Sequence, residues 1–498
     1  MNMKTTKIIF SFFLACTTIF IINACGEEDL ELVNPNGLSP ETFFRTEAQV
    51  QSAVNAVYSN LQTGGLYSRH MFFSQDNMSH ENSGNPQLEA DKKQYLDFSF
   101  DSSHGPIADY WESCFRGINK ANFVIGNEES INAIEDGILA PELKAKFVGE
   151  AKFMRALFYF FLVTRFGNVP LITEIPTTTD GVPISPSDAI YDLIVSDLQS
   201  ATTSLLPKGV EVNGRATREA AIAMLGKVYL YRQQYGLALT EFEKLSGLDL
   251  EEDYFDNFRE ETEHGIESIF EVEYDDALGT SAQWNSQVSG EGPNEATFRG
   301  QEYGFNDWFN VYPSNDLLDE YEEGDLRYAA NFYSVGDTFA GGDRVVTAED
   351  LTAGEQRRAG WKKYQNYYKD ANEDTESGIN FKYLRYADVL LMMAECENEV
   401  GTQADAVGYI NRVRERAGLD DLPTGLSKAQ VFDAIVHERK VELAGEQIRF
   451  NDILRWNLAA TELSGTNFQV GKNELWPIPD REIFSNEAVT SADQNPGY

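Results

Sequence analysis

The sequence predicts a mainly α-helical protein in which tetratricopeptide-like helix hairpins form a right-handed superhelical scaffold. A hairpin pattern occupies residues 220–245, and a weaker copy of it occupies residues 386–418. Further helical periods lie on both sides of these hairpins. Between them, residues 246–378 are rich in Gly, Asn, Asp and aromatic residues and lack a sustained helical period. We therefore predict an irregular, loop-rich, aromatic insertion that carries little β structure.

The N-terminal residues 1–24 are predicted to be a lipoprotein signal peptide. Two lysines precede a mostly apolar run over residues 8–22, which is shorter than the ~20 apolar residues of a membrane-spanning helix. The run ends in the sequence INAC, which resembles the lipobox of bacterial lipoprotein precursors, where the cysteine after the cut is acylated. We expect lipid on Cys25 and a lipidated N-terminus and tether over residues 25–45. The alternative is a conventional cleavage site before an ordinary cysteine.

Three segments outside the hairpins have a helical period. They cover residues 46–61, 144–166 and 428–444. Pro141 lies just before the second segment and Gly167 just after it, as is usual at the two ends of a helix. Each of these segments is therefore predicted to form a helix of the scaffold.

The hairpin at residues 220–245 matches the tetratricopeptide repeat at its defining positions. If Gly226 takes position 8, then Leu225, Tyr229, Ala238 and Phe242 fall where the repeat expects Leu, Tyr, Ala and Phe. The small residues are expected to let the two helices approach closely, while the aromatic residues fill the space between hairpins. The second hairpin repeats these offsets at Ala394, Ala406 and Ile410.

The composition excludes several classes of function. The formal net charge is -40, so nucleic acid is a poor partner because a phosphate backbone requires a basic surface. The 80 acidic residues single out no carboxylate pair, and we find no motif of a metalloprotease, serine hydrolase or phosphate-binding loop. No catalytic, metal or cofactor site is predicted. Cys114 and Cys396 lie within apolar helical patterns, and we expect them to be buried free thiols.

Several motifs in the mature chain resemble one family, the SusD/RagB family of outer-membrane nutrient-binding lipoproteins. The matching motifs are EAKFMRA at 150–156, FGNVPLI at 166–172, RYADVLLM at 385–392, ERKVEL at 438–443, RFNDILRW at 449–456, LWPIP at 475–479 and QNPGY at 494–498. Their order and spacing span nearly the whole mature chain, so the resemblance is specific.

The resemblance implies a single SusD-like domain over residues 46–498 that binds a nutrient and is not an enzyme. Its expected partner is a SusC-like TonB-dependent transporter, and its expected cargo is an oligosaccharide or polysaccharide. The acidic residues 27–29 after the lipidation site resemble a surface-export signal of Bacteroidetes lipoproteins. We therefore expect a protein that is lipid-anchored in the outer membrane and faces the cell exterior. The matched arginines Arg155, Arg385 and Arg439 are expected to form buried or half-buried ion pairs.

A glycan site requires exposed aromatic rings beside polar side chains, because sugar rings have C–H faces edged by hydroxyls. The clearest such stretch is QEYGFNDWFNVYP at residues 301–313, and a lone Trp284 lies among small polar residues. The alternative is that these aromatic residues attach the irregular insertion to the helices. The candidate ligand-binding residues in these segments are Trp284, Tyr303, Asn306, Trp308 and Tyr312.

The resemblance also places part of the binding face in the segment after the first helices. In this chain that segment is MFFSQDNMSHENSGN, in which Asp76 and Asn77 are candidates for binding sugar hydroxyls. Alternatively, these two residues cap a turn.

The favoured hypothesis is a surface glycan-binding lipoprotein that delivers its ligand to the transporter, with a neutral glycan preferred because the chain is so acidic. One alternative is a peptide-binding lipoprotein of the same uptake system, and a less favoured one is a glycoside hydrolase. A tetratricopeptide scaffold that binds only protein is a further alternative. The aromatic insertion argues against it, because a purely helical scaffold does not need one.

Overall fold

N-cap residues and hydrophobic periodicity determine where the scaffold helices begin and end. The computed structural model describes residues 43–176, 180–278, 295–352, 357–372 and 377–498, in which Thr46–Tyr498 form one compact unit. The side chains of Thr217, Thr402 and Ser427 each accept a hydrogen bond from a backbone N–H of the helix that follows. Such caps satisfy N–H groups that have no partner within the helix.

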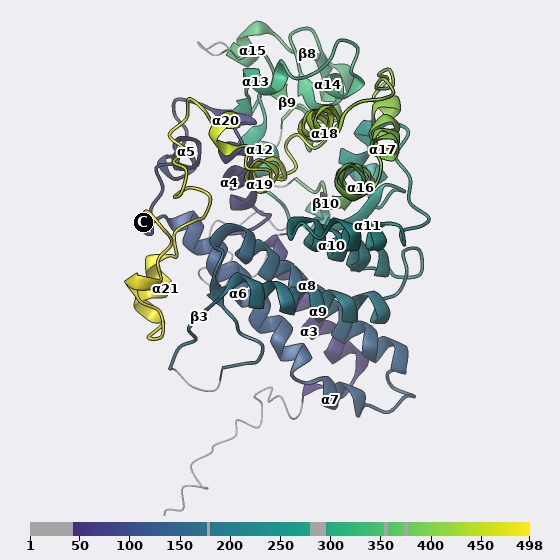
Figure 1. Ribbon diagram of the computed structural model, residues 1–498, viewed down its shortest axis with the longest axis vertical. Helices are drawn as coiled ribbons and strands as arrows, with labels where there is room; N and C mark the ends of the chain where they lie inside the picture. The colour runs from purple at the N-terminus through teal and green to yellow at the C-terminus, as the bar shows by residue number, and fades with distance from the viewer. Residues whose placement is uncertain (1–42, 177–179, 279–294, 353–356, 373–376) are drawn as a thin grey trace, which may run out of the picture. The chain divides into compact units, whose positions relative to one another are not determined.

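The predicted mainly α-helical class is confirmed (Figure 1). The helices are α3 Glu47–Tyr58, α4 His70–Met78, α5 Ala90–Asp97, α6 Gly105–Ile125, α7 Glu128–Asn132, α8 Pro141–Phe166, α9 Ser187–Ser204, α10 Arg218–Tyr231, α11 Tyr235–Phe242, α12 Arg299–Tyr303, α13 Asn315–Leu318, α14 Leu326–Asn331, α15 Ala348–Thr352, α16 Tyr386–Val400, α17 Gln403–Arg416, α18 Lys428–Glu442, α19 Arg449–Arg455, α20 Ala459–Glu462 and α21 Asp480–Ser485. Among the described residues, every helix is too short or too polar to span a bilayer.

The described strands are short and pair two by two into antiparallel ribbons. The pairs are β1 Asn82–Gly84 with β5 Val311–Pro313, β2 Val169–Pro170 with β3 Ile184–Ser185, β4 Ser268–Val272 with β10 Phe381–Arg385, β6 Phe332–Tyr333 with β9 Gly360–Trp361, and β7 Thr338–Phe339 with β8 Arg344–Val345. Most of these strands lie in the predicted insertion, which is otherwise made of loops and short helices. The pair of β4 and β10 joins the insertion to the chain that leads into α16.

Neighbouring helices pack as hairpins along the scaffold. Helix α8 packs against α6 and α9, α10 packs against α9 and α11, and α16 packs against α11, α17 and α18. Figure 1 shows α3, α6, α8 and α9 together, with α10 and α11 between them and α16. The hairpins of α10 with α11 and of α16 with α17 are the two that the repeat pattern predicts.

The small residues of the repeat act as predicted. A Cβ atom added at Gly226 in α10 lies 2.4 Å from the Phe242 ring of α11, so only glycine permits this approach. In the second hairpin, Ala394, Ala406 and Ile410 are all fully buried in one hydrophobic cluster. The helix at Pro141–Phe166 starts with its proline in the first turn and ends at Gly167, which has a φ of 69°. Cys114 and Cys396 are buried free thiols, which confirms that prediction.

The arginines of the matched motifs form buried ion pairs, as predicted. Arg155 in α8 pairs with Asp197 in α9 at 2.8 Å, which joins these neighbouring helices. Arg385 pairs with Glu267 at 2.7 Å and with Glu442 at 2.5 Å. These contacts link β10 to α18 and to the loop before β4.

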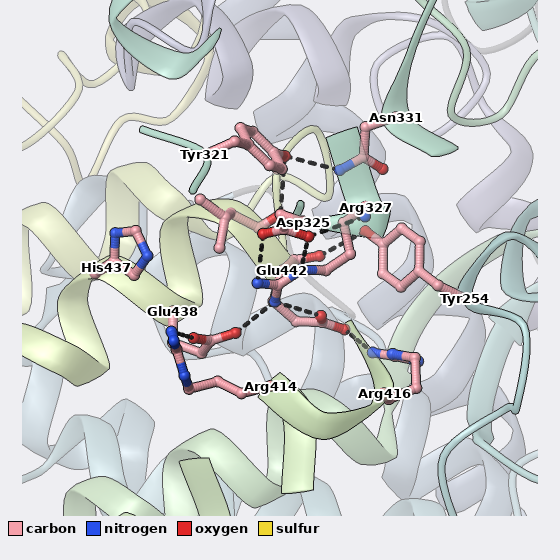
Figure 2. Close-up of polar contacts among 12 residues, drawn as sticks. Tyr254, Tyr321, Asp325, Arg327, Asn331, Arg414, Arg416, His437, Glu438 and Glu442 are labelled. Carbon is pink, nitrogen blue, oxygen red and sulfur yellow. Dashed lines mark hydrogen bonds and ion pairs between the residues drawn. The ribbon is translucent and has the colours of Figure 1, made fainter. Parts of the chain in front are cut away.

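A second arginine reaches Glu442 from the insertion. Figure 2 shows Arg327 of α14 among Asp325, Glu438 and Glu442, and the pair of Arg327 with Asp325 measures 2.8 Å. Because these charges are buried, the pairing orients α14 against α18. Glu442 of α18 therefore binds both Arg385 of β10 and Arg327 of the insertion, and so attaches both segments to the scaffold.

Candidate functional site

The candidate site lies on the loop between α12 and β5, within the aromatic stretch that the sequence analysis identified. The loop closes tightly, because the backbone N–H groups of Phe309 and Asn310 donate to the carbonyls of Gly304 and Glu302 at 3.1 and 2.9 Å. Trp308 lies within this turn, where its backbone N–H donates to the carbonyl of Gln301 at 3.2 Å, and it is 39% exposed. A large exposed indole next to polar side chains can contact the flat face of a ring-shaped ligand.

The loop that carries Trp308 packs on buried aromatic residues. Phe305 and Phe309, on either side of Trp308, are buried in one hydrophobic cluster with Tyr333, Phe339 and Tyr367. This burial fixes the backbone on both sides of the indole. The alternative role in the sequence analysis, attachment of the insertion, therefore applies to the two phenylalanines, whereas Trp308 points outward.

Polar contacts orient the two residues before Trp308. The Tyr367 hydroxyl donates to Oδ2 of Asp307 at 2.6 Å and accepts the backbone N–H of Asn306 at 2.9 Å. Nδ2 of Asn306 donates to the carbonyl of Ala371 at 2.8 Å. Asn306 and Asp307 are half-buried, so each combines a fixed position with access to solvent. Such groups can bind the hydroxyls of a ligand that lies on the indole.

Tyr312 is half-buried on the neighbouring strand β5, where it pairs with Ser83 of β1. The guanidinium of Arg357 lies 4.7 Å from the centre of the Tyr312 ring and 4.9 Å from that of Phe309. Arg357 is itself buried. Its charge therefore stabilises the positions of both rings through cation–π contacts.

Asp76, Asn77 and Tyr303 are placed differently from the prediction. All three are fully buried, so they present no surface to a ligand in this structure. The Tyr303 hydroxyl donates to Oδ2 of Asp76 at 2.9 Å, and Nε2 of Gln447 donates to the same oxygen at 2.9 Å. Nδ2 of Asn82 donates to Oδ1 of Asn77 at 3.0 Å.

The physical reason for this difference is the burial of nearly the whole of helix α4. Every residue from Met71 to Met78 is buried, including its polar ones. Burial raises the pKa of Asp76, while Arg299 at 3.7 Å and the hydrogen bonds from Gln447 and Tyr303 oppose that rise. These residues therefore connect α4 to α12 and to residue 447, and we leave them out of the candidate ligand contacts.

Two predicted residues lie outside the described part of the chain. Trp284 lies in residues 279–294, and the predicted lipidation site Cys25 lies in residues 1–42. Three other residues contact or neighbour the site and were missed by the sequence analysis, namely Tyr367, Arg357 and Asn85. Tyr367 and Arg357 lie about 50 or more positions along the chain from Trp308. No local pattern in the sequence could have linked them to it.

The surface also has an open hollow elsewhere, with a volume of about 430 Å³, beside α6 and α21. Its lining includes Trp111, half-buried Phe115 and Arg116. The indole Nε1 of Trp111 donates to Oε2 of Glu482 at 3.1 Å. This hollow also combines aromatic and polar side chains. Binding experiments therefore need one variant in the Trp308 loop and another in this hollow.

Comparisons with known proteins agree with the fold over nearly the full length. A family model described as the SusD family matches residues 266–498, and one described as starch-binding associating with outer membrane matches residues 30–230. SusD-like protein P2 of Formosa agariphila is 29% identical, with both chains covered completely. A SusD-like protein of Bacteroides ovatus is 26% identical over 88% of this chain and 81% of its own.

Solved structures show the same architecture. A laminarin-binding SusD-like protein superposes with a TM-score of 0.74 and is 26% identical, covering 91% of this chain and 100% of its own. A SusD superfamily protein from Bacteroides vulgatus has a TM-score of 0.79 at 24% identity, covering 92% of this chain and 100% of its own. The fold thus defines a helical protein built on tetratricopeptide-like hairpins with a loop-rich insertion. The chain belongs to the SusD/RagB family.

Proposed function

We propose that this protein is a cell-surface glycan-binding lipoprotein that captures an oligosaccharide or polysaccharide and delivers it to a SusC-like TonB-dependent transporter. The observation that carries the proposal is the exposed Trp308 on its supported loop, in a family that includes a laminarin-binding member. The proposed contacts are stacking of a sugar ring on Trp308, with Asn306 and Tyr312 beside it. Trp284 is proposed as a second aromatic contact.

The charges around the loop favour a neutral glycan. Within residues 299–313 the charged side chains are Arg299, Glu302 and Asp307, of which the first two are buried. Within this segment the accessible charge is therefore the Asp307 carboxylate, and Arg357, 4.7 Å from the centre of the Tyr312 ring, is buried. A uronate or sulfate group would meet this carboxylate, and residues 299–313 offer it no exposed cation, which lowers its affinity.

The proposed location is the outer membrane, with a lipid anchor at Cys25 and the folded unit facing the cell exterior. The INAC sequence and the family model described as associating with outer membrane support it. The proposed activity is binding without catalysis. Support comes from family members whose names describe binding, as for the laminarin-binding protein.

The test is calorimetric titration of the mature chain carrying Cys25→Ser against laminarin, starch and anionic polysaccharides. We expect one neutral glycan to bind and Trp308→Ala to weaken it by about 10-fold or more, because stacking and burial of an aromatic ring contribute ~1–3 kcal/mol. Leu237→Ala is the control, since Leu237 is 51% exposed on α11 of the helical scaffold and does not line the hollow beside α6 and α21.

Three results would change the proposal. Release of reducing ends during incubation would show an enzyme. Binding that survives Trp308→Ala but is lost in Phe115→Ala would move the site to the hollow beside α6. Absence of binding to every glycan, together with binding to a peptide, would replace the proposed cargo.

A further inference from the structure

Arg165, in the last turn of α8, is a buried cation without a counter-ion among the described residues. It is 1% exposed, and neither Nη1 nor Nη2 has a hydrogen-bond partner within the described ranges. Among the described residues, the ionisable groups that act on its charge are the tyrosines Tyr110, Tyr231 and Tyr191, and none of them is a carboxylate. Arg155 in the same helix, by contrast, has Asp197 at 2.8 Å. An unpaired buried charge of this kind is strongly unfavourable.

The contacts that Arg165 does make only partly offset this cost. Its guanidinium lies 5.0 Å from the centre of the Phe450 ring and 5.9 Å from that of Trp476. Burial lowers the pKa of Arg165 to about 10. At neutral pH the side chain is therefore still protonated, and its charge remains to be balanced.

Arg165 lines a small cavity of about 30 Å³ between α4, α8, α10 and α19, in which polar and apolar side chains are mixed. That volume holds one or two water-sized particles. Oε1 of Gln75 and the hydroxyl of Tyr231, both from residues that line the cavity, also have no partner among the described residues. Thr164, Tyr231 and Asn451 are half-buried, so the cavity approaches the surface beside them.

Two further charged residues line this cavity, and both are already paired. Lys227 lies 3.1 Å from Asp388. Glu446 lies 2.6 Å from Lys363 and 2.7 Å from Arg385. The unbalanced charge in the lining is therefore the positive charge of Arg165.

We propose that this cavity binds one small monovalent anion, a halide such as chloride, as the counter-ion of Arg165. The guanidinium N–H groups and the Tyr231 hydroxyl are hydrogen-bond donors suited to an anion. A cavity of this volume fits a monatomic ion better than it fits a sulfate, a phosphate or a carboxylate-bearing molecule. The bound ion joins the C-terminal turn of α8 to α4, α10 and α19. This site does not depend on the proposed glycan function.

The direct test is anomalous diffraction from crystals of the mature chain with Cys25→Ser soaked in sodium bromide. We expect one bromide peak within hydrogen-bonding distance of the Arg165 guanidinium, and no peak there in Arg165→Met. Arg165→Lys keeps the charge and should retain a weaker peak. A cavity that holds only ordered water in the wild-type crystals overturns the proposal, whether or not the variants fold.

A solution measurement gives a second test. The melting temperature of the wild-type protein should be higher in sodium chloride than in sodium gluconate at equal ionic strength, by roughly 2 °C, because gluconate is too large for the cavity. The difference should vanish in Arg165→Met. Equal melting temperatures in the two salts would contradict a halide site.

Discussion

Arg439 of α18 donates from Nη1 to Oδ1 of Asp388 in α16 at 2.8 Å, with both side chains almost completely buried. Its Nε donates to Asp452 of α19 at 2.7 Å, and Lys227 of α10 reaches Asp388 from the other side at 3.1 Å. Burial alone would raise the pKa of Asp388, but Lys227 and Arg439 outweigh it and hold that pKa well below its usual range. A single chain of charges thus connects four helices of the scaffold.

Removal of Arg439 should be costly because Asp388 and Asp452 both stay buried and lose the cation that they share. We expect Arg439→Met to lower the free energy of unfolding by ~3–5 kcal/mol in urea denaturation. Arg412→Met is the control, since Arg412 and its partner Asp249 are exposed, and it should cost less than ~1 kcal/mol. Equal small losses in the two variants would show that the buried chain of charges contributes no stability.

The close approach of α10 and α11 gives a second prediction. Gly226→Ala places a methyl group 2.4 Å from the Phe242 ring, so we expect a loss of ~1–3 kcal/mol in the free energy of unfolding. Gly236 in α11 has open space around it, and Gly236→Ala should be neutral or stabilise by up to ~1 kcal/mol. Thermal or urea denaturation measures both changes. A Gly226→Ala variant as stable as the wild type would mean that the helices separate without cost.

His437 and Glu320 predict a defined pH dependence of stability. Burial lowers the pKa of His437, but the hydrogen bond from Nδ1 to Oε1 of Glu320 at 2.7 Å and nearby carboxylates raise it overall. The same hydrogen bond is the main cause that lowers the pKa of Glu320 to about 2. The contribution of His437 to the free energy of unfolding is fully present below its unfolded pKa of ~6.5. It is lost as the pH rises through the raised pKa of the folded state. The Glu320 contribution is complete above ~4.5 and is lost toward about 2.

The measurement is the melting temperature of the wild type and of His437→Gln across pH 4 to 9. We expect the melting temperature of the wild type to exceed that of His437→Gln by the largest amount between about pH 4.5 and 6.5, and the difference to shrink above that range. An advantage that is constant with pH, or that grows above neutral pH, would contradict a charged His437 in the folded state.

Tyr367 should affect ligand affinity although it lies beneath the exposed surface. Tyr367→Phe removes the hydroxyl that holds Asn306 and Asp307, so we expect about 3- to 10-fold weaker glycan binding with the Trp308 stacking retained. The neighbouring Tyr368→Phe is the control, because that hydroxyl donates to Glu261 at 2.6 Å instead. Equal effects of the two variants on the dissociation constant would argue against a positioning role for Tyr367.

Much of the scaffold could be predicted because its signals are local. The helix predicted over 46–61 is α3 Glu47–Tyr58 followed by a 3₁₀ turn at Ser59–Gln62, and the one predicted over 428–444 is α18 Lys428–Glu442. Hydrophobic period and capping residues act within one or two helical turns, so they can be recognised without tertiary contacts. The run of aromatic and polar residues around Trp308 could likewise be recognised in the sequence, and it contains the exposed indole.

The same local signals failed for the polar residues of α4. Asp76 and Asn77 resemble surface residues in the sequence, but their hydrogen-bond partners Gln447, Tyr303 and Asn82 make burial possible. The partner of Arg155 is another example, because nothing in the sequence favours Asp197 over the nearer Glu150.

By itself, the sequence determined the helical class, the two repeat hairpins, the irregular insertion and the presence of an aromatic loop, since each depends on residues that are neighbours along the chain. The tertiary structure alone decided which polar side chains face solvent, which charges pair and which charge is left unbalanced. A buried polar group is stable only when partners from other elements satisfy it, and those partners, such as Asp388 for Arg439, are brought close only by folding. Arg165 has no such partner among the described residues, and only the folded structure could reveal this.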